Sequence, residues 1–349
     1  MLIKSIALND YRNYSRKYFE FDPHLNIIIG KNGVGKTNIL ESILVVSNTK
    51  SYRTSDDQNL IKKDCDFARI NLVSDEGIFK VVINKKNKSL YINNDLIKKT
   101  SEFIGRINAV LFKPSDLELF TQSPSERRKL LDIEISKVSK NYIQALLKYN
   151  SLLKDKNKLL KELEPDRILL NVINESMEPL IKIIIEEREK FFQTINEYIS
   201  EKYSLISGKE TEIKIIYDKC CETDEIKNEL ERTKEKDDYY HYAVFGPHHD
   251  DYRFLMNGYE LNSTASQGQK RMALIAFKFA LIRYIKDNIN KTPVVLLDDI
   301  LSELDKENQE RLLKIIPENA QVIITNTDIH NLKIDKEYKL IELKEEENV

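Results

Sequence analysis

Eight consecutive residues combine the glycines, the lysine and the hydroxyl group that a phosphate-binding loop needs. The segment from Gly30 to Thr37 reads Gly-Lys-Asn-Gly-Val-Gly-Lys-Thr and fits the pattern G-x-x-x-x-G-K-[ST]. Glycines let backbone N–H groups converge on phosphate oxygens at the N-terminus of the following helix. Three of the nine glycines in the chain lie here. We therefore expect nucleotide binding, rather than a purely structural turn, by the whole loop: Gly30, Lys31, Asn32, Gly33, Val34, Gly35, Lys36 and Thr37.

Two carboxylates follow an apolar segment late in the chain, where Val294–Leu297 leads directly into Asp298 and Asp299. Strand ends in an open parallel sheet face the ligand crevice, so Asp298 is expected to bind Mg²⁺ together with the Thr37 hydroxyl. Asp299 is the candidate catalytic base for an attacking water, and Lys36 the catalytic contact to the β- and γ-phosphates. The alternative is that the two carboxylates merely cap the segment after a core strand.

A third motif, Ser266-Gln267-Gly268-Gln269, opens a helical segment and resembles the signature motif of ABC-type ATPases. Residues 301–305, Leu-Ser-Glu-Leu-Asp, look like the D-loop of the same superfamily. The resemblance implies that two protomers sandwich two ATP molecules, with the γ-phosphate contacted across the dimer by Ser266 and the Gly268 N–H. Gln269 is also among the expected nucleotide-binding residues. Taken alone, Ser266 is an ordinary N-cap residue of a helix.

Further blocks resemble the RecF family within this superfamily. They occur in order at residues 10–14 (Asp-Tyr-Arg-Asn-Tyr), 112–117, 123–128, 246–251 and 297–305. The resemblance implies an α/β ABC-type ATPase head formed by residues 1–122 and 239–349, interrupted by a mostly helical second lobe at residues 123–238. It also implies an ATP-driven dimer that binds single-stranded, gapped or junction DNA in recombinational repair and replication-fork maintenance. The family role includes assistance to RecA loading with RecR and RecO, and SOS induction.

The chain departs from the family pattern at several positions. His249 stands where RecF proteins usually carry arginine, and Asp299 stands where transporter-type ATPases use glutamate, which suggests slow hydrolysis. No switch histidine directly follows Thr325-Asn326-Thr327, and His330 is expected to be incidental. Asp116 is the candidate substitute for a glutamine that many ABC proteins carry. Arg12 and Asn13 are expected to contact the nucleotide, although a structural loop is nearly as well supported.

Patterns of apolar residues place these motifs on strands and helices. Short strands are expected at residues 3–8, 18–21, 68–73, 79–84 and 89–92, and buried strands at 25–29, 108–112, 294–297 and 321–324. Helices are expected at residues 36–46, 269–286 and 308–316. Residues 125–235 read as long helical pattern with few breakers, notably over 127–157 and 171–205. Helical sequence thus interrupts an α/β domain.

The formal charge of the chain is −2, but basic residues cluster. Residues 127–161 contain ten Lys or Arg and three acidic residues, and a second basic cluster forms a turn at residues 85–88. Such clusters suit the phosphates of DNA, but they are also typical of a solvated face. Arg127 and Arg128 could instead hold the second lobe against the head. The candidate DNA contacts are Arg127, Arg128, Lys154, Lys156, Lys158, Lys161, Lys85, Lys86 and Lys88.

Composition excludes several classes of protein. No apolar stretch approaches the roughly 18 residues of a membrane span, and no signal-peptide hydrophobic segment opens the sequence, so a cytoplasmic protein without a membrane partner is expected. Three cysteines cannot form a disulfide framework. Two alternatives share the phosphate loop: the ATP-driving subunit of a membrane transporter and a small-molecule kinase. The RecF-like blocks disfavour the first, and a kinase needs neither the signature motif nor a dimer.

Overall fold

The computed structural model describes residues 1–329 and 337–344, and the chain forms two compact units. Unit 1 comprises residues 1–116, 201–209 and the segment from Leu274 onward. Unit 2 comprises residues 117–200 and 210–273. The chain therefore leaves unit 1 after Asp116, returns to it for residues 201–209, and returns again at Leu274 after completing unit 2. These units group residues 239–273 with the helices, whereas the sequence-based division assigns them to the head, and that division stays a prediction.

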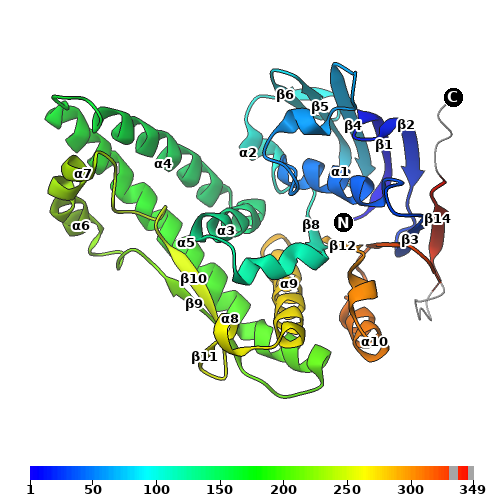
Figure 1. Ribbon diagram of the computed structural model, residues 1–349. Helices are drawn as coiled ribbons and strands as arrows, with labels where there is room; N and C mark the ends of the chain where they lie inside the picture. Colours follow the sequence, from blue (N-terminus) through cyan, green and yellow to red (C-terminus); the bar gives the residue numbers. More distant parts are fainter. Residues whose placement is uncertain (330–336, 345–349) are drawn as a thin grey trace. The chain divides into compact units, whose positions relative to one another are not determined.

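An antiparallel sheet forms one layer of unit 1 (Figure 1). Its described strands run in the order β2-β1-β4-β5-β6-β7, and each pairs with its neighbour in antiparallel register. Apolar residues alternate along β4 and β5, so one face of the sheet is buried and the other is not. The bounds are β1 Ile3–Tyr11, β2 Tyr14–Glu20, β4 Phe67–Ser74, β5 Gly77–Asn84, β6 Lys88–Ile92 and β7 Asp95–Ile97.

A parallel sheet forms the second layer of unit 1, in the order β14-β3-β13-β12-β8. The strands are β3 Leu25–Ile29, β8 Ala109–Phe112, β12 Val294–Asp298, β13 Val322–Asn326 and β14 Lys339–Glu342. Helix α1 (Lys36–Asn48) contacts strands of both sheets, and Ile39, Leu40 and Ile43 on it are fully buried. Parallel pairing places the carboxyl ends of β3, β12 and β13 at one edge, where the nucleotide motifs begin.

The remaining elements of unit 1 connect and cover the sheets. They are η1 (Asp57–Leu60), α2 (Thr100–Phe103), η3 (Ile300–Glu303) and α10 (Lys306–Ile315). Three elements cross the division between the units: η2 (Pro114–Phe120), α5 (Arg167–Ser207) and α9 (Gln267–Ile289).

Unit 2 combines helices with a small antiparallel sheet (Figure 1). The long helix α5 (Arg167–Ser207) starts here and ends in unit 1. The described sheet has the order β11-β10-β9, from β9 Ile213–Asp218, β10 Asp251–Met256 and β11 Tyr259–Glu260. The other helices are α3 Pro124–Val138, α4 Lys140–Leu159, α6 Ile226–Arg232, α7 Lys234–Tyr240 and α8 Leu261–Thr264.

The predicted fold class is confirmed, and two details of the helical segment are wrong. Residues 213–218 form strand β9 rather than helix, because pairing with β10 buries Ile213 and Ile215. The helical pattern over residues 127–157 is two helices, since Ser139 ends α3 and its Oγ accepts a 3.1 Å hydrogen bond from the Tyr142 N–H of α4. None of the described helices is both long and apolar enough to cross a membrane.

Candidate nucleotide-binding site

The phosphate loop connects β3 to α1, as its sequence predicts. Lys36 is 4% exposed, and its Nζ donates hydrogen bonds to the carbonyl oxygens of Gly30, at 2.6 Å, and Lys31, at 3.1 Å. Gly35 precedes α1 with φ 112°, a conformation that side chains rarely adopt. A Cβ there would lie 2.5 Å from the Tyr14 hydroxyl and 2.8 Å from Nδ2 of Asn13. Glycine at this position is therefore required by both backbone conformation and packing.

Asp298 lies where three neighbouring segments meet. Its Oδ1 accepts hydrogen bonds from the Thr37 hydroxyl, at 3.0 Å, and the Thr325 hydroxyl, at 2.8 Å. The hydroxyl of Tyr52 is 3.4 Å from Oδ2. Burial raises the pKa of Tyr52, and the charge of Asp298 raises it further, so the phenol stays protonated and can donate. Asp298 is thus held as an oriented carboxylate beside the phosphate loop.

Asp299 differs from Asp298 in both conformation and surroundings. Its backbone is left-handed, with φ 50°, and its side chain makes no capping hydrogen bond to η3, contrary to the capping alternative. Oδ1 of Asp299 is buried and makes no hydrogen bond within the described chain. Burial raises the pKa of Asp299, Lys36 opposes the rise, and the adjacent Asp298 adds to it. A carboxyl group with a raised pKa and an oxygen atom that makes no hydrogen bond has the properties of a general base that could accept a proton from a water molecule.

The oxygen donors at this edge fit Mg²⁺. Thr37 and Asp298 present a hydroxyl and a carboxylate oxygen 3.0 Å apart. Mg²⁺ prefers oxygen ligands and is commonly bound by one or two protein groups, with waters and substrate phosphates completing its coordination. The described residues contain no cluster of three or more His, Cys, Asp or Glu side chains suited to a metal. If Mg²⁺ binds here, Thr37 and Asp298 would hold it and leave its other coordination positions to water and phosphate oxygens.

Arg12 and Asn13 both support the phosphate loop, in different ways. The Arg12 guanidinium makes two hydrogen bonds to Glu41 of α1, at 2.8 and 2.6 Å, and a third to the Asn59 carbonyl at 2.8 Å. Glu41 is fully buried, and hydrogen bonding to it raises the pKa of Arg12. Asn13 donates to the Val34 carbonyl at 3.1 Å and accepts from Asn38 at 2.7 Å. The expected nucleotide contacts of Arg12 and Asn13 stay predictions, and their roles in positioning the loop are visible.

Four residues of this site were missed by sequence reasoning: Tyr52, Thr325, Glu41 and Asn38. Thr325 is the last residue but one of β13, the strand beside β12, so a hydroxyl at the carboxyl end of a predicted strand was the available signal. Glu41 lies among apolar residues in α1, and an acidic residue in such a setting predicts a buried partner. Nothing local distinguishes Tyr52 from other tyrosines.

Asp116 takes part in an ionic contact rather than pointing into solvent. Its Oδ2 accepts from the Lys113 N–H at 3.1 Å and lies 3.4 Å from Nζ of Lys278, and both side chains of this ion pair are below 10% exposed. Lys113 also places its Nζ 5.1 Å from the centre of the Tyr52 ring. Asp116 therefore anchors the segment after β8.

The signature segment in unit 2 is exposed and satisfies its own hydrogen bonds. Ser266 Oγ accepts from the Gln269 N–H at 3.3 Å, and Gln269 Oε1 accepts from the Ser266 N–H at 2.8 Å. This reciprocal pair is a capping box for α9, as the alternative interpretation of Ser266 requires. Gly268 is exposed, and a Cβ there would meet no described atom within 4 Å. Packing within the protomer therefore does not explain the glycine.

His249 and its neighbours make structural contacts in unit 2. Nε2 of His249 is 3.3 Å from the Ala243 carbonyl, and Nδ1 of His248 is 2.5 Å from the Tyr149 hydroxyl. Burial lowers the pKa of His248 to about 4, so that imidazole is neutral at physiological pH. A Cβ at Gly246 would clash with the Tyr149 hydroxyl. His330, expected to be incidental, lies outside the described residues.

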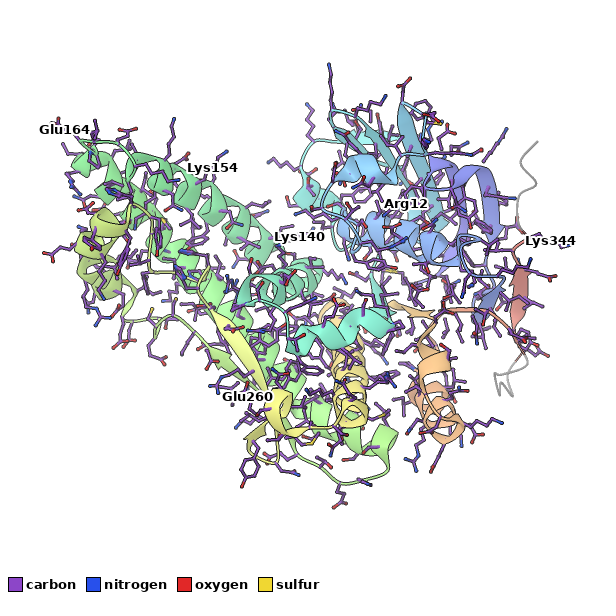
Figure 2. All side chains as sticks on the ribbon, in the orientation of Figure 1. Arg12, Lys140, Lys154, Glu164, Glu260 and Lys344 are labelled. Carbon is purple, nitrogen blue, oxygen red and sulfur yellow. The ribbon has the colours of Figure 1, made fainter. Side chains whose placement is uncertain are left out.

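The structure separates the candidate DNA contacts into buried and exposed groups, and the prediction for Lys156 is wrong. Lys156 is 2% exposed and forms a 2.7 Å ion pair with the equally buried Asp237. A buried charge that is already paired cannot reach a phosphate. Lys154, which is labelled in Figure 2, is exposed on α4. Lys158, four residues later on the same side of the helix, and Lys161 beyond the helix are also exposed.

The other candidates are partly engaged. Arg127 binds Asp251 through Nε, at 2.8 Å, and Arg128 donates to the Asp250 carbonyl at 2.7 Å. These contacts favour the structural role for both arginines, inside unit 2. In the turn between β5 and β6, Lys85 pairs with Asp66 at 2.9 Å and Lys88 with Asp57 at 2.7 Å, whereas Lys86 is exposed.

Comparison with known proteins agrees with this geometry. The family described as RecF/RecN/SMC N terminal domain matches residues 2–348. The DNA replication and repair protein RecF of Lachnoclostridium phytofermentans is 36% identical, over 98% of each chain. The protein of the same name from Acholeplasma laidlawii is 35% identical, over 100% of this chain and 99% of that one.

Solved structures extend the likeness to three dimensions. The recombination mediator protein RecF of the RecFOR pathway, solved with ATP, is 30% identical and superposes with a TM-score of 0.89 over 96% of this chain and 94% of that chain. An Smc head domain from Pyrococcus furiosus has a TM-score of 0.56 at 19% identity, which shows a common fold alone. A phosphate loop facing two strand-end carboxylates in an ABC-type fold, with relatives matched along their full length, leads to one conclusion: the chain belongs to the RecF family of DNA replication and repair proteins.

Proposed function

We propose that this protein is an ATP-dependent DNA-binding switch of recombinational repair and replication-fork maintenance. ATP closes a homodimer on DNA at single-strand gaps, and slow hydrolysis reopens it. The closed state assists RecA loading, together with RecR and RecO, and thereby SOS induction, in the cytoplasm. The solved RecF relative is described as part of the RecFOR pathway, which supports this choice of partners.

Nucleotide chemistry in this proposal uses residues that already lie together. Lys36 and the loop amides hold the phosphates, and Thr37 with Asp298 holds Mg²⁺, which neutralises phosphate charge when bound. Asp299 orients and deprotonates the attacking water through its free Oδ1. The Asp299 side chain is shorter than the glutamate of transporter-type ATPases, so we expect slow ATP hydrolysis, which suits a molecular switch.

The exposure of Gly268 is the main structural support for the proposed dimer. Apart from its two chain neighbours and the adjacent backbone of α9, no described atom of its own protomer lies within 4 Å of a Cβ at this position, and its φ is not in the left-handed region. A glycine that neither the fold nor the backbone requires is explained when another molecule must approach the backbone closely. A phosphate bound by a second protomer, next to the N-terminus of α9, satisfies that condition.

The γ-phosphate is the differential contact in this proposal, so ATP favours closure and ADP does not. The test compares the dimer fraction of four proteins by light scattering with ATP and with ADP. Lys36→Met should lose nucleotide binding or turnover. Ser266→Arg should bind ATP but remain monomeric, because its added bulk blocks the phosphate of the partner.

Ser263→Arg is the matched control, since Ser263 is also exposed and lies three residues earlier. It should dimerise like the unaltered protein. Equal dimer fractions with ATP and ADP, or normal ATP-dependent dimerisation by Ser266→Arg, would remove the sandwich dimer from the proposal.

A further inference from the structure

The antiparallel sheet of unit 1 has a second face that does not pack against α1. Directly opposed residues of antiparallel strands share a face. Leu8, Ile70 and Val81 form one such row in the buried core. The rows beside it therefore point the other way. One of them crosses the six strands from β2 to β7 and consists of Tyr18, Ala7, Asn71, Lys80, Tyr91 and Leu96.

Aromatic side chains flank this outer sheet face, which comprises that row and its neighbours Arg16, Asn9, Arg69, Phe67 and Val82. Tyr18 is 60% exposed and Phe67 is 40% exposed. Tyr91 is partly exposed four strands along the row, about 19 Å from Tyr18 at the usual spacing between strands. The residues between them in the row include Ala7 and Asn71, which are small enough to leave the aromatic rings standing above the sheet.

Cations lie among these rings. The guanidinium of Arg69 is 5.7 Å from the centre of the Phe67 ring, and Nζ of Lys80 is 5.5 Å from the centre of the Tyr91 ring. Arg16 is exposed on β2 beside Asn9. Among the described residues of these strands, Glu20 is the acidic side chain on the same face, and it accepts a hydrogen bond from the Tyr18 hydroxyl at 3.1 Å. The face is therefore positive in a chain whose total charge is −2.

We propose that the outer sheet face binds single-stranded nucleic acid, an inference that rests on the proposed DNA-binding function and gives it a location. Tyr18, Phe67 and Tyr91 stack with bases, while Arg16, Arg69 and Lys80 contact phosphates. Aromatic platforms combined with a basic surface are the general solution for binding single strands without sequence preference.

The exposed aromatic side chains favour single-stranded nucleic acid over a duplex as the ligand of this face. A stacking platform needs the flat face of an unpaired base, which a duplex keeps inside its helix. Phosphate contacts alone would serve a duplex equally well, but they would leave two exposed aromatic rings and the partly exposed Tyr91 without a role. The rim of the face also meets the turn that carries the exposed Lys86, one of the predicted DNA contacts.

The experiment measures binding of a fluorescent oligothymidylate and of a DNA duplex by anisotropy, at several salt concentrations, with ATP present. The triple variant Tyr18→Leu, Phe67→Leu, Tyr91→Leu keeps apolar bulk but removes the rings. It should bind the oligothymidylate at least about tenfold more weakly and the duplex as before. Arg69→Ala with Lys80→Ala should lower the salt slope for the single strand by about 1.4, or roughly 0.7 for each lost phosphate contact.

The control combines Tyr259→Leu with Lys227→Ala, which removes one exposed ring and one exposed cation from unit 2. It should bind like the unaltered protein, and thermal melting confirms that all variants are folded. Folded triple variants with unchanged single-strand affinity would overturn this site alone, as would equal losses for single strand and duplex. An unaltered protein that binds no DNA with any nucleotide would overturn the proposed function itself.

Discussion

The Thr37 hydroxyl donates a 3.0 Å hydrogen bond to Oδ1 of Asp298, a residue 261 positions later in the chain. Thr37 is the second residue of α1, and Asp298 is the last residue of β12. The contact therefore joins the N-terminal and C-terminal sequence segments that together form unit 1. Thr325 binds the same carboxylate oxygen from β13. The contact places a hydroxyl and a carboxylate at the edge where the phosphates of a nucleotide are expected.

Replacement of Asp298 by Asn should weaken Mg²⁺-dependent ATP binding by about 10- to 100-fold, in the range found when metal-site partners are lost. The amide oxygen can still accept hydrogen bonds from Thr37 and Thr325, so the fold should be retained. ATP affinity is measured by calorimetry as Mg²⁺ is titrated. Without Mg²⁺ the variant and the unaltered protein should bind ATP equally, and a persistent difference would assign Asp298 to folding instead.

Replacement of Asp299 by Asn should lower ATP hydrolysis by about 10²- to 10⁴-fold while ATP binding is retained, because a general base is lost. Since burial raises the pKa of Asp299 in the folded state, its ionisation opposes folding. The free-energy cost of ionising Asp299 is absent at pH values below the pKa of Asp299 in the unfolded chain. It is fully present at pH values above its pKa in the folded protein. The stability gain of the variant should therefore appear as pH rises towards neutral, and it should be small because the group is partly solvated.

Thermal melting of the Asp299→Asn variant between pH 3 and 8 checks that sign. A variant that is less stable than the unaltered protein at pH 7 would contradict the raised pKa. Unchanged hydrolysis would remove Asp299 from the mechanism.

Replacement of Gly35 by Ala should abolish ATP binding, because the new Cβ would lie 2.5 Å from the Tyr14 hydroxyl in a left-handed backbone. Gly33→Ala is the matched control in the same loop. It shares the positive φ, at 86°, but its Cβ would meet no described atom within 4 Å, so only the backbone strain of about 1–3 kcal/mol applies. Thermal shift with and without ATP compares the two, and equal losses would show that packing on Tyr14 is unimportant.

Replacement of Lys156 by Met should destabilise the protein by about 3–5 kcal/mol, because the buried Asp237 carboxylate would lose its counter-ion. Lys158→Met, two residues away on the exposed side of α4, should change stability by less than about 0.5 kcal/mol. Urea unfolding measures both. The double variant Lys156→Met, Asp237→Leu should regain much of the loss, and failure to do so would assign the effect to packing of the Lys156 chain.

The sequence by itself determined the phosphate loop, the strand-end carboxylates, the order of the motifs and the interruption by a helical segment. These features are local: a loop binds phosphate through consecutive backbone amides, and a buried parallel strand is a run of apolar residues. Each of these features is encoded by residues that are adjacent in the sequence, so it can be predicted without knowledge of the tertiary structure.

Only the tertiary structure decided which polar groups meet and which charges are free. Lys156 and Lys158 are both lysines in the same helix, yet Lys156 is buried and paired with Asp237, whereas Lys158 faces solvent. Tyr52 and Thr325 reach Asp298 through packing of separate segments. Strand β9 forms inside a helical pattern because β10 offers it a partner. Burial and pairing depend on neighbours distant in sequence, and these set the free energy of a charge, a hydroxyl or a strand.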